Sequence, residues 1–520
     1  MEYAHGALHW LAASAVNTVY YANNLSFQPK ALKFYYNGLA STSNANTFST
    51  TTNARAGIGF AVSTTERRNV TYFSQDAHSP AGNTACMKSN NCIAATITAA
   101  ATVDGLLDLN SIDANGFSLI VDDATPVDIT VFWEAWGGSD ITVAVVGDID
   151  EPTGITTTTD ANVDYTVTGF DNNAGKDQCV MLAGCHASTL NNSALASAGG
   201  LFHGWATAAA EKDVDNPELV SAAFAITDNV AQSQASTSCG RDIRIGCYAV
   251  VARFASVTSP TAALTAFDTN KFTLRWFGQE SLQNRRHIFM AIKGGRWKAG
   301  YTTIDCTLTN AKAYPTYPLD FDPIGFDIFS NFHYFSTDGT ESRLKITENG
   351  TRNTMGETGG AEFGLGCAKS TTSRQSMYIV DTNGLSTSAV VLSLQFDSCM
   401  HHVVSGGARN IIDVTSFSKA NVELNVDSSS TFAHPNMALG LLYFGTKEPT
   451  ANQEGFRWRA DDGSETTASW LAAQDTNINR SRNVATRLRV LNDTTSNVAT
   501  SNARIQFKRS DEPDSEWRDV

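Results

Sequence analysis

The sequence predicts an all-β protein made of three tandem, jelly-roll-like β-sandwich repeats and a small C-terminal β-sandwich. Three observations support this fold class. Apolar stretches of roughly five to eight residues, rich in Val, Phe, Ile and Thr, alternate with Gly, Asn, Asp and Ser turns. Five landmarks recur three times in the same order. The chain has 520 residues, which suits several domains of roughly 100–200 residues each better than one core.

Each repeat has an opening Phe segment, a strand with small residues around an aromatic one, a Ser/Thr-rich turn with Arg, a late strand and a closing apolar strand. The first copy reads FQPKALKF at Phe27, GIGFA at Gly57, STTERRNV at Ser63, NGFSL at Asn115 and VFWEAWGGSDITVAVVG at Val131. The second reads FDNNAGKDQCVML at Phe170, FHGWA at Phe202, STSCGRDIRI at Ser236, NKFTL at Asn270 and HIFMAIKGGRWKAGYTTI at His287. The third reads FDPIGFDIF at Phe321, GLGCA at Gly364, STTSRQSMYIV at Ser370, KANVEL at Lys419 and MALGLLYFGTKEP at Met437. A period of roughly 140–155 residues predicts a triplicated domain and not a solenoid.

These landmarks set the expected domain boundaries. The repeats are expected at residues 27–150, 165–305 and 317–447, with an insertion at 207–235 in the second copy whose Ala-rich stretch favours a short helix. The doublets Gly137-Gly138 and Gly294-Gly295 are typical of hairpin turns between the last two strands of a sandwich, because such turns need positive φ. The tail, 452–520, alternates like a small β module after a linker.

Six residues are candidates for interactions. Arg67 (or its neighbour Arg68), Arg241 and Arg374 end the Ser/Thr-rich turns, where a guanidinium suits either a recurrent ligand contact or a clamp on loop carbonyls. The remaining three, Trp10, Tyr20 and Tyr21, lie in residues 1–26, which precede the first repeat and are expected to form an arm that packs on a neighbouring subunit.

Charge and hydropathy exclude several partners. The formal charge of −15 repels phosphate, so no nucleic-acid partner is expected. In the tail, the basic residues alternate with apolar ones, which favours a solvated strand face over a DNA-binding one: Arg457, Arg459, Arg487, Arg489, Arg504 and Lys508. No apolar run approaches the roughly 18 residues of a membrane-spanning helix, and the N-terminus lacks the basic start of a secretory signal. We therefore expect no membrane insertion.

No pattern of catalytic, metal-binding or cofactor-binding residues stands out. The nine cysteines form no CxxC pair and are expected to be buried free thiols, with disulfides across neighbouring strands as the alternative. His401 and His402 are adjacent, so on a strand they point to opposite faces and cannot share one ion without a turn. The acids Asp148, Asp150 and Glu151 lack the full ligand set of a calcium loop. We expect no enzyme activity, no cofactor and no metal.

The tail carries a resemblance to a known group of proteins. Its W-R-x-D-D-G-S start at Trp458, W-L-A-A-x-x-T centre, R-L-R strand and final Q-F-K-R-S and W-R-D-V resemble a module of predicted virion and tail-associated proteins of marine bacteriophages. The F-x-P-x-A and F-D-P-I-G-F openings are similar to β-sandwich repeats in the same proteins, so the resemblance covers most of the chain from about Phe27 onward. It implies a class of protein and transfers no catalytic residue.

Three function classes remain open. The resemblance implies a structural, surface-exposed virion protein, either a tail fibre or tail accessory protein or a capsid decoration subunit, assembled in the host cytoplasm with other virion proteins. The alternative is a receptor- or carbohydrate-binding adhesin that stacks sugars from the host surface on tryptophans such as Trp133, Trp136, Trp205, Trp276 and Trp297. A polysaccharide-degrading enzyme is the third. Because a tail of about 65–70 residues is marginal alone, we expect a homo-oligomer, and specifically a trimer.

Overall fold

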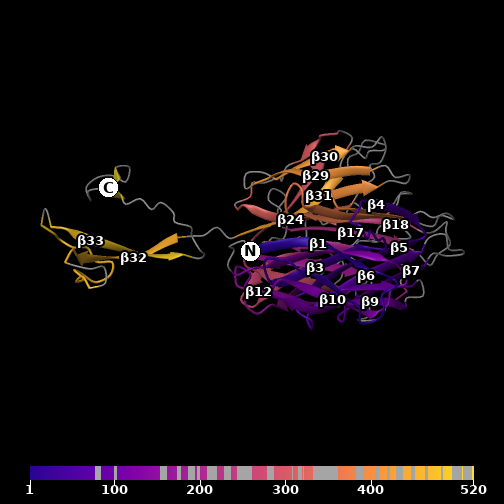
Figure 1. The fold of residues 1–520 in the computed structure, drawn as a ribbon, viewed down its shortest axis with the longest axis horizontal. Helices are drawn as coiled ribbons and strands as arrows, with labels where there is room; N and C mark the ends of the chain where they lie inside the picture. The colour runs from indigo at the N-terminus through magenta and orange to yellow at the C-terminus, as the bar shows by residue number, and fades with distance from the viewer. Residues whose placement is uncertain are drawn as a thin grey trace. The chain divides into compact units, whose positions relative to one another are not determined.

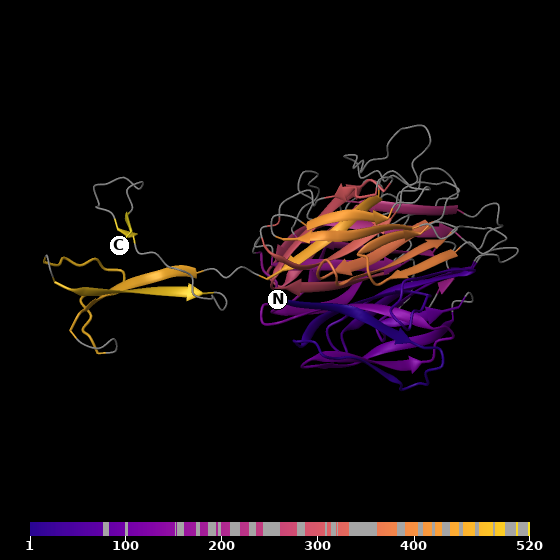
Figure 2. The ribbon, with the colours of Figure 1, turned by 45° about the horizontal axis from the view of Figure 1, so that its top comes forward.

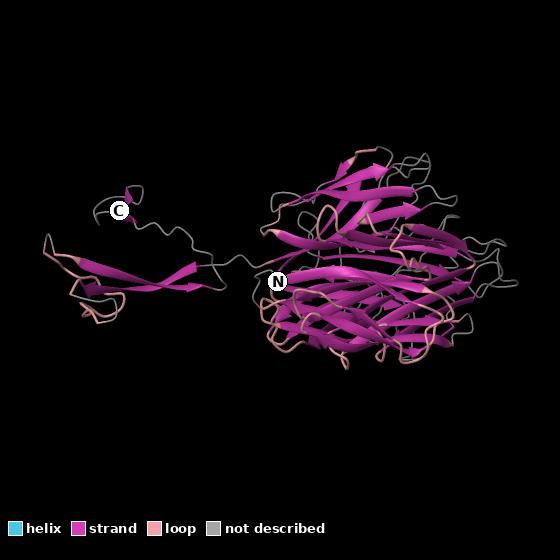
Figure 3. Cartoon of the chain, viewed as in Figure 1, coloured by secondary structure: helices cyan, strands magenta, loops and turns pink. Residues whose placement is uncertain are grey.

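The structure, a computed structural model, is built from β-strands (Figure 3). It describes the chain except for residues 76–82, 99–101, 151, 153–160, 173–176, 186–193, 196–198, 208–218, 228–235, 243–260, 278–285, 307–308, 314–318, 320, 332–360, 382–389, 404–408, 419–421, 429–436, 447–450, 463–466, 482–483, 495–505, 508–517 and 520. No helix occurs among the described residues, which confirms the all-β prediction. Within them, accordingly, no helix has the length and apolarity needed to cross a membrane.

The chain divides into two compact units, residues 1–447 and 448–520. In the first unit, repeat 1 contains β1 (Glu2–Trp10), β2 (Val19–Ala22), β3 (Pro29–Asn37), β4 (Thr47–Thr51), β5 (Asn53–Ala61), β6 (Arg67–Gln75), β7 (Asn83–Ser89), β8 (Ala94–Ile97), β9 (Val103–Asp113), β10 (Gly116–Asp123) and β11 (Ile129–Gly137). Repeat 2 contains β12 (Val143–Asp150), β13 (Ala161–Thr166), β14 (Gln178–Cys185), β15 (Ala194–Leu195), β16 (Gly199–Ala206), β17 (Leu219–Thr227), β18 (Ser236–Asp242), β19 (Thr261–Asp268), β20 (Lys271–Phe277) and β21 (Arg286–Lys293). Repeat 3 contains β22 (Arg296–Ile304), β23 (Lys312–Ala313), β24 (Pro323–Asn331), β25 (Ala361–Ala368), β26 (Arg374–Asp381), β27 (Val390–Gln395), β28 (Met400–Val403), β29 (Arg409–Phe417), β30 (Val422–Ser428) and β31 (Met437–Gly445).

Each repeat pairs a large sheet with a small one, and all strand pairs are antiparallel. The large sheets run β1-β11-β3-β5-β6-β7, β12-β21-β14-β16-β17-β18 and β22-β31-β24-β25-β26-β27; the small ones run β2-β10-β9-β8, β13-β20-β19 and β23-β30-β29-β28. The landmark segments GIGFA, FHGWA and GLGCA lie on β5, β16 and β25, the fourth strand of each large sheet. The expected equivalence of these three segments is therefore confirmed.

The first strand of each repeat lies earlier in the chain than the expected boundaries place it. Glu2–Trp10 pairs along its whole length with β11, and Trp10 is fully buried in the core of repeat 1. The N-terminal arm expected at 1–26 is therefore wrong: this segment supplies β1 and β2. In the same way β12 pairs with β21, and β22 pairs with β31, so both belong to the repeat that follows them.

The Gly doublets explain this shift of the boundaries. Gly138, Gly294 and Gly295 do have positive φ, as a tight turn requires. The strands on either side of each doublet do not pair with each other, however, because β11 is flanked by β1 and β3, and β21 by β12 and β14. The doublets therefore connect one repeat to the next and do not close hairpins. In the second repeat, the expected helical insertion includes strand β17; residues 208–218 and 228–235 lie outside the described part.

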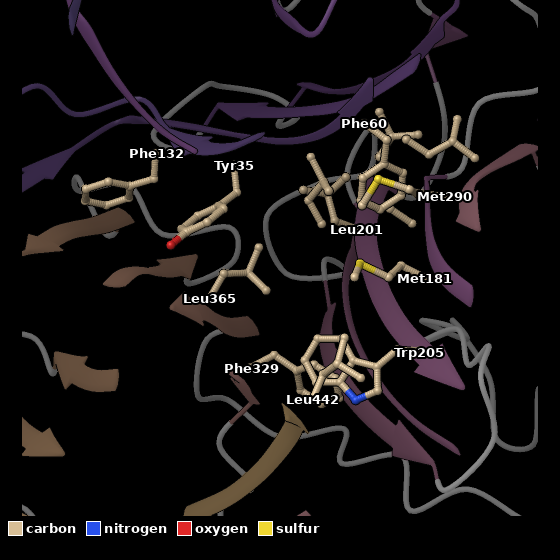
Figure 4. Packing of buried hydrophobic residues seen from close by; sticks show 14 of the residues in the cluster. Tyr35, Phe60, Phe132, Met181, Leu201, Trp205, Met290, Phe329, Leu365 and Leu442 are labelled. Atoms are coloured by element: carbon tan, nitrogen blue, oxygen red, sulfur yellow. The ribbon is translucent and has the colours of Figure 1, made fainter. Parts of the chain in front are cut away.

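The central strands are buried on both faces, which explains their nearly continuous apolar sequences. On β3, Leu32, Phe34 and Tyr36 face the small sheet of repeat 1, whereas Ala31 and Tyr35 point the other way. That second face belongs to a cluster shared by all three large sheets. Figure 4 shows this interior, with side chains from the three repeats, among them Phe60, Met181, Trp205, Phe329 and Leu442.

The shared core makes residues 1–447 one body with three sandwiches, and not three independent beads. Figures 1 and 2 show repeat 1, in indigo and purple, and repeat 3, in orange, on opposite sides of this unit. Two edge strands are also exchanged between repeats. β4 of repeat 1 extends the large sheet of repeat 3 by pairing with β27, and β15 of repeat 2 pairs with β7 of repeat 1. Such added strands cover sheet edges that would otherwise be open.

The second unit contains β32 (Ala451–Ala460) paired with β33 (Thr486–Thr494), and β34 (Gln506–Phe507) paired with β35 (Arg518–Asp519). Of the small sandwich expected here, the described residues form these two ribbons. The loop after β32 returns along its free edge, where Leu471 N donates to Trp458 O and Asp475 N to Phe456 O. The described part of this unit is therefore held by backbone pairing between neighbouring segments.

Candidate functional site

Four ionisable side chains meet inside the shared core, and we call them the junction cluster: Lys33, Glu134, His203 and Asp327. All four are fully buried. Lys33 on β3 lies directly opposite Glu134 on β11, with Lys33 Nζ 3.3 Å from Glu134 Oε1. Asp327 comes from β24 of repeat 3 and contacts Lys33 Nζ through Oδ2. His203 comes from β16 of repeat 2, with Nε2 3.7 Å from the same carboxylate oxygen. The cluster thus draws on all three repeats.

Neighbouring polar and aromatic groups hold these side chains in place. Tyr3 Oη donates to Glu134 Oε2 at 2.8 Å, and His203 Nδ1 lies 2.8 Å from the carbonyl of Leu182. The Lys33 ammonium lies 5.3 Å from the ring centroid of Tyr35, close enough for a cation–π contact. These contacts leave the amine and the two carboxyl groups little rotational freedom.

Burial decides the charge states in the cluster. It raises the pKa of Glu134 to about 8, with the Asp327 charge adding to the effect, so Glu134 is protonated at neutral pH. Burial also lowers the pKa of His203, with help from the Lys33 charge, so this imidazole is neutral. For Lys33, burial alone would lower the pKa, but Asp327 and Glu134 outweigh it and the pKa is raised. Burial thus favours the neutral forms of Glu134 and His203, whereas the neighbouring carboxyl groups favour the ammonium form of Lys33.

Sequence reasoning did not single out any member of the junction cluster. A signal was present, since ALKFYY and GFDIFS each place one charged residue in the middle of a buried apolar strand, where an unpaired charge is very costly. Because all four side chains are enclosed, they are positioned to act on one another and on the packing of the repeats.

Two of the three candidate arginines form the same structural clamp. Arg67 Nε and Nη2 donate to Asp108 at 2.7 and 2.6 Å, and Nη2 also donates to the carbonyl of Asn91. Arg374 forms an ion pair with Asp413 at 3.1 Å and donates to two loop carbonyls. Each clamp ties the large sheet to the small sheet of its own repeat. These contacts match the clamp interpretation of the two residues.

Arg241 is not the third member of this set. Arg67 and Arg374 pair with Ala61 and Ala368, the last residues of their landmark strands, and in repeat 2 the residue opposite Ala206 is Leu219. Arg241 lies one strand later, on β18. The Ser/Thr-rich turns of the three repeats have similar sequences. In repeat 2, however, extra residues form a strand directly after FHGWA, so the turn with Arg241 lies one strand later than in the other two repeats.

The three aromatic candidates near the N-terminus have different environments. Trp10 is buried, and Tyr20 is half-buried, with its hydroxyl bonded to Leu11 N and Ser14 Oγ. Tyr21 is 64% exposed on β2. Of the three, Tyr21 alone therefore presents most of its ring to solvent.

The described residues contain no group of three His, Cys, Asp or Glu side chains arranged to hold a metal ion. His401 Nδ1 lies 2.8 Å from Ser376 Oγ, whereas His402 Nε2 lies 3.1 Å from Glu362 Oε2, so the two imidazoles do diverge as expected. Asp148, a candidate calcium ligand, is bonded to Arg68 and Lys88. The seven described cysteine side chains are buried and form no disulfide, which confirms the buried-thiol interpretation for them: Cys86, Cys92, Cys179, Cys185, Cys306, Cys367 and Cys399.

Among the described residues, few surface features suit a sugar-binding site. All five tryptophans proposed for sugar stacking are buried: Trp133, Trp136, Trp205, Trp276 and Trp297. A hollow of 550 Å³ lies where repeat 1 meets the start of repeat 2, lined by Lys30, Glu66 and mostly uncharged residues. Lys30 Nζ already donates to the carbonyl of Ile141 at 2.6 Å there. In the second unit, Trp470 is 42% exposed.

Comparison with known proteins adds no assignment. No protein-family model matches the chain, and no curated protein matches it.

Proposed function

We propose that this chain is a structural, surface-exposed bacteriophage virion protein, a tail fibre or tail accessory protein or a capsid decoration subunit, that works through protein–protein contacts. The observation that carries the proposal is the shared core. The three sandwiches share one hydrophobic core, and the junction cluster is buried inside it. The packed interior therefore makes residues 1–447 a rigid body. A rigid body with a separate C-terminal unit suits assembly, and the resemblance of the tail to virion modules points the same way.

The second unit supports the oligomer that belongs to this proposal. On one face of its ribbon, Phe456 and Trp458 lie opposite Val490 and Leu488, and the latter two are 41% and 37% exposed. A two-stranded ribbon is at best marginally stable alone, so covering this face in an oligomer would stabilise it. We therefore propose a homo-oligomer, specifically a trimer, associated through the C-terminal unit.

The test is to locate the chain on particles. Particles purified from a lysate that contains the chain are labelled with antibody against residues 1–447 and imaged by electron microscopy. Labelling of the tail or capsid exterior supports the proposal and separates its two forms. Recovery of the chain in the soluble fraction, with particles free of it, contradicts the proposal. Mass measurement of the purified protein at micromolar concentration tests the trimer, and a monomer would contradict that part.

The adhesin alternative is favoured by one observation, at Trp470. The guanidinium groups of Arg457 and Arg459 lie 4.2 and 4.6 Å from the centroid of its ring. An exposed aromatic ring held by cation–π contacts is a suitable platform for the apolar face of a sugar. Binding to a glycan array that is lost in Trp470→Ala and kept in Val484→Ala, an equally exposed residue of the same unit, would support this function. Equal binding by both variants would contradict it.

A further inference from the structure

The junction cluster brings together a primary amine, a carboxyl group that can acylate it and a second carboxyl group. Lys33 Nζ contacts Asp327 Oδ2 and lies 3.3 Å from Glu134 Oε1, and the exposed fraction of each side chain is zero. Lys33 and Glu134 are cross-strand neighbours in repeat 1, while Asp327 reaches them from repeat 3. The amine is thus held against the carboxyl group of Asp327, and the carboxyl group of Glu134 lies beside the same amine.

If Lys33 and Asp327 formed only an ion pair, one buried oxygen of the Asp327 carboxylate would lack a hydrogen bond from the described residues. Removing an ammonium and a carboxylate from water costs several kcal/mol per ion, and the attraction compensates only when the remaining lone pairs are also bonded. Asp327 Oδ1 is buried and accepts no hydrogen bond from the described residues. A neutral amide at the same place would carry no charge to desolvate.

We propose that Lys33 and Asp327 condense spontaneously into an isopeptide bond that covalently joins repeat 1 to repeat 3. The two residues are 294 positions apart, so the bond would enclose the whole of repeat 2 in a covalent loop. The reaction needs no partner molecule, and it depends neither on a virion location nor on host binding.

The atoms balance without any oxidant, reductant or activated donor. A proton first passes from the Lys33 ammonium to the Asp327 carboxylate, which gives a neutral amine and a neutral acid. The amine lone pair then attacks Cγ of Asp327, forming the C–N bond and a tetrahedral centre. The C–O bond to the protonated Oδ2 breaks, and that oxygen leaves as water with one further proton. The amine loses its second proton, and Glu134 ends in the state in which it began.

Glu134 is placed to move these protons. Because burial favours its protonated form, Glu134 can donate a proton to the departing Asp327 oxygen and take one back from the nitrogen. Tyr3 Oη, bonded to Glu134 Oε2, fixes the orientation of the carboxyl group. His203 is neutral and places no second positive charge beside the amine.

The surroundings favour condensation over hydrolysis. Amide formation from an amine and an acid is unfavourable in dilute water. Holding the two groups in contact, however, is equivalent to a very high effective concentration, about 10⁵–10⁸ M for well-oriented groups. The enclosing side chains, which include Tyr35, Trp205 and Phe329, leave an apolar interior in which the bond, once formed, is shielded from water.

Peptide mapping of the full chain tests the bond directly. The purified protein is denatured, digested with trypsin and analysed by mass spectrometry. We expect a branched peptide that joins the Lys33 and Asp327 segments, lighter by one water than the two linear peptides together, and no cleavage after Lys33. Recovery of both segments as separate peptides, with cleavage after Lys33, would overturn the proposal. A water lost within a single linear peptide would overturn it as well, because that is dehydration at another site.

Variants separate the roles of the three groups. Lys33→Arg and Asp327→Ala should abolish the branched peptide, whereas Lys30→Arg, on the same strand but at its exposed end, should keep it. In Glu134→Gln the branched peptide should form about 10²–10⁴-fold more slowly after synthesis in a cell-free system. Linkage at the wild-type rate in Glu134→Gln would refute the role of Glu134. The wild-type peptide map decides the existence of the bond even if a variant fails to fold.

Discussion

The shared core makes a sharp prediction about Trp205. This side chain is fully buried among the three large sheets, its ring centroid lies 4.6 Å from that of Phe329 in repeat 3, and its Nε1 donates to the carbonyl of Leu441 at 3.1 Å. Trp276 is the matched control, because it is equally buried but lies in the core between the two sheets of repeat 2, where it stacks on His287.

Replacing either tryptophan with Ala should cost about 3–5 kcal/mol, the usual range for removing a large aromatic side chain from a core. Because a domain is stable by only about 5–15 kcal/mol, both variants should unfold at clearly lower denaturant concentration. The location of the loss should differ. Trp205→Ala opens a cavity against repeat 3, so the amides of β24 and β31 should lose protection from hydrogen exchange. Trp276→Ala should leave those two strands protected.

Hydrogen exchange monitored by mass spectrometry distinguishes the two cases, strand by strand, at a denaturant concentration where both variants are folded. If Trp205→Ala left β24 and β31 as protected as in the wild-type protein, the three repeats would be energetically independent and the reasoning from the shared core would fail. If Trp276→Ala loosened repeat 3 as much as Trp205→Ala, the effect would be global and would not depend on the contact across the repeats.

Two further predictions concern a close backbone approach and pH. A Cβ at Gly366 would lie 2.1 Å from the carbonyl oxygen of Cys399, so Gly366→Ala should lower the free energy of unfolding by about 1–3 kcal/mol or more. Gly300 has open space around it, so Gly300→Ala should leave this free energy unchanged or raise it by about 0.4–1 kcal/mol. Denaturant unfolding of both variants measures the difference. Burial raises the pKa of Asp413 from 3.8 to about 6, in spite of Arg374. Because the folded state then binds the proton more tightly than the unfolded state, stability should fall by about 1–2 kcal/mol as the pH rises from about 4 to 6, after allowance for solvent screening. A stability profile of Asp413→Asn that fell equally over this range would contradict the assignment.

Much of the fold could be predicted because the apolar pattern of each strand and the residues of each turn can be read directly from the sequence. The strands with GIGFA, FHGWA and GLGCA were recognised as equivalent, and their inward aromatic residues Phe60 and Trp205 do lie in a core. The sequence does not say which of two strands around a Gly-Gly doublet pairs with which partner, because both arrangements need the same positive φ. Because of that ambiguity, the expected start of each repeat lies at least one strand too late, and β1 was interpreted as an arm.

The junction cluster could not be predicted for a different reason. Lys33 and Asp327 are ordinary charged residues within their own repeats, and their meeting depends on how two sandwiches pack, which is a contact between positions 294 residues apart. Likewise, the tryptophans proposed for sugar stacking are apolar residues of strands with two buried faces, and the sequence cannot tell a second buried face from an exposed one.

The triplication has a chemical consequence that a trimer of identical chains could not reach. Lys33, Met181 and Asp327 occupy the same register position in the three repeats, opposite Phe60, Trp205 and Cys367 respectively. In a homotrimer these positions would carry one residue type, and a lysine would face two more lysines. Because the three copies belong to one polypeptide, each copy can carry a different residue there. An amine, a thioether and an acid therefore occupy one structural position of the repeat.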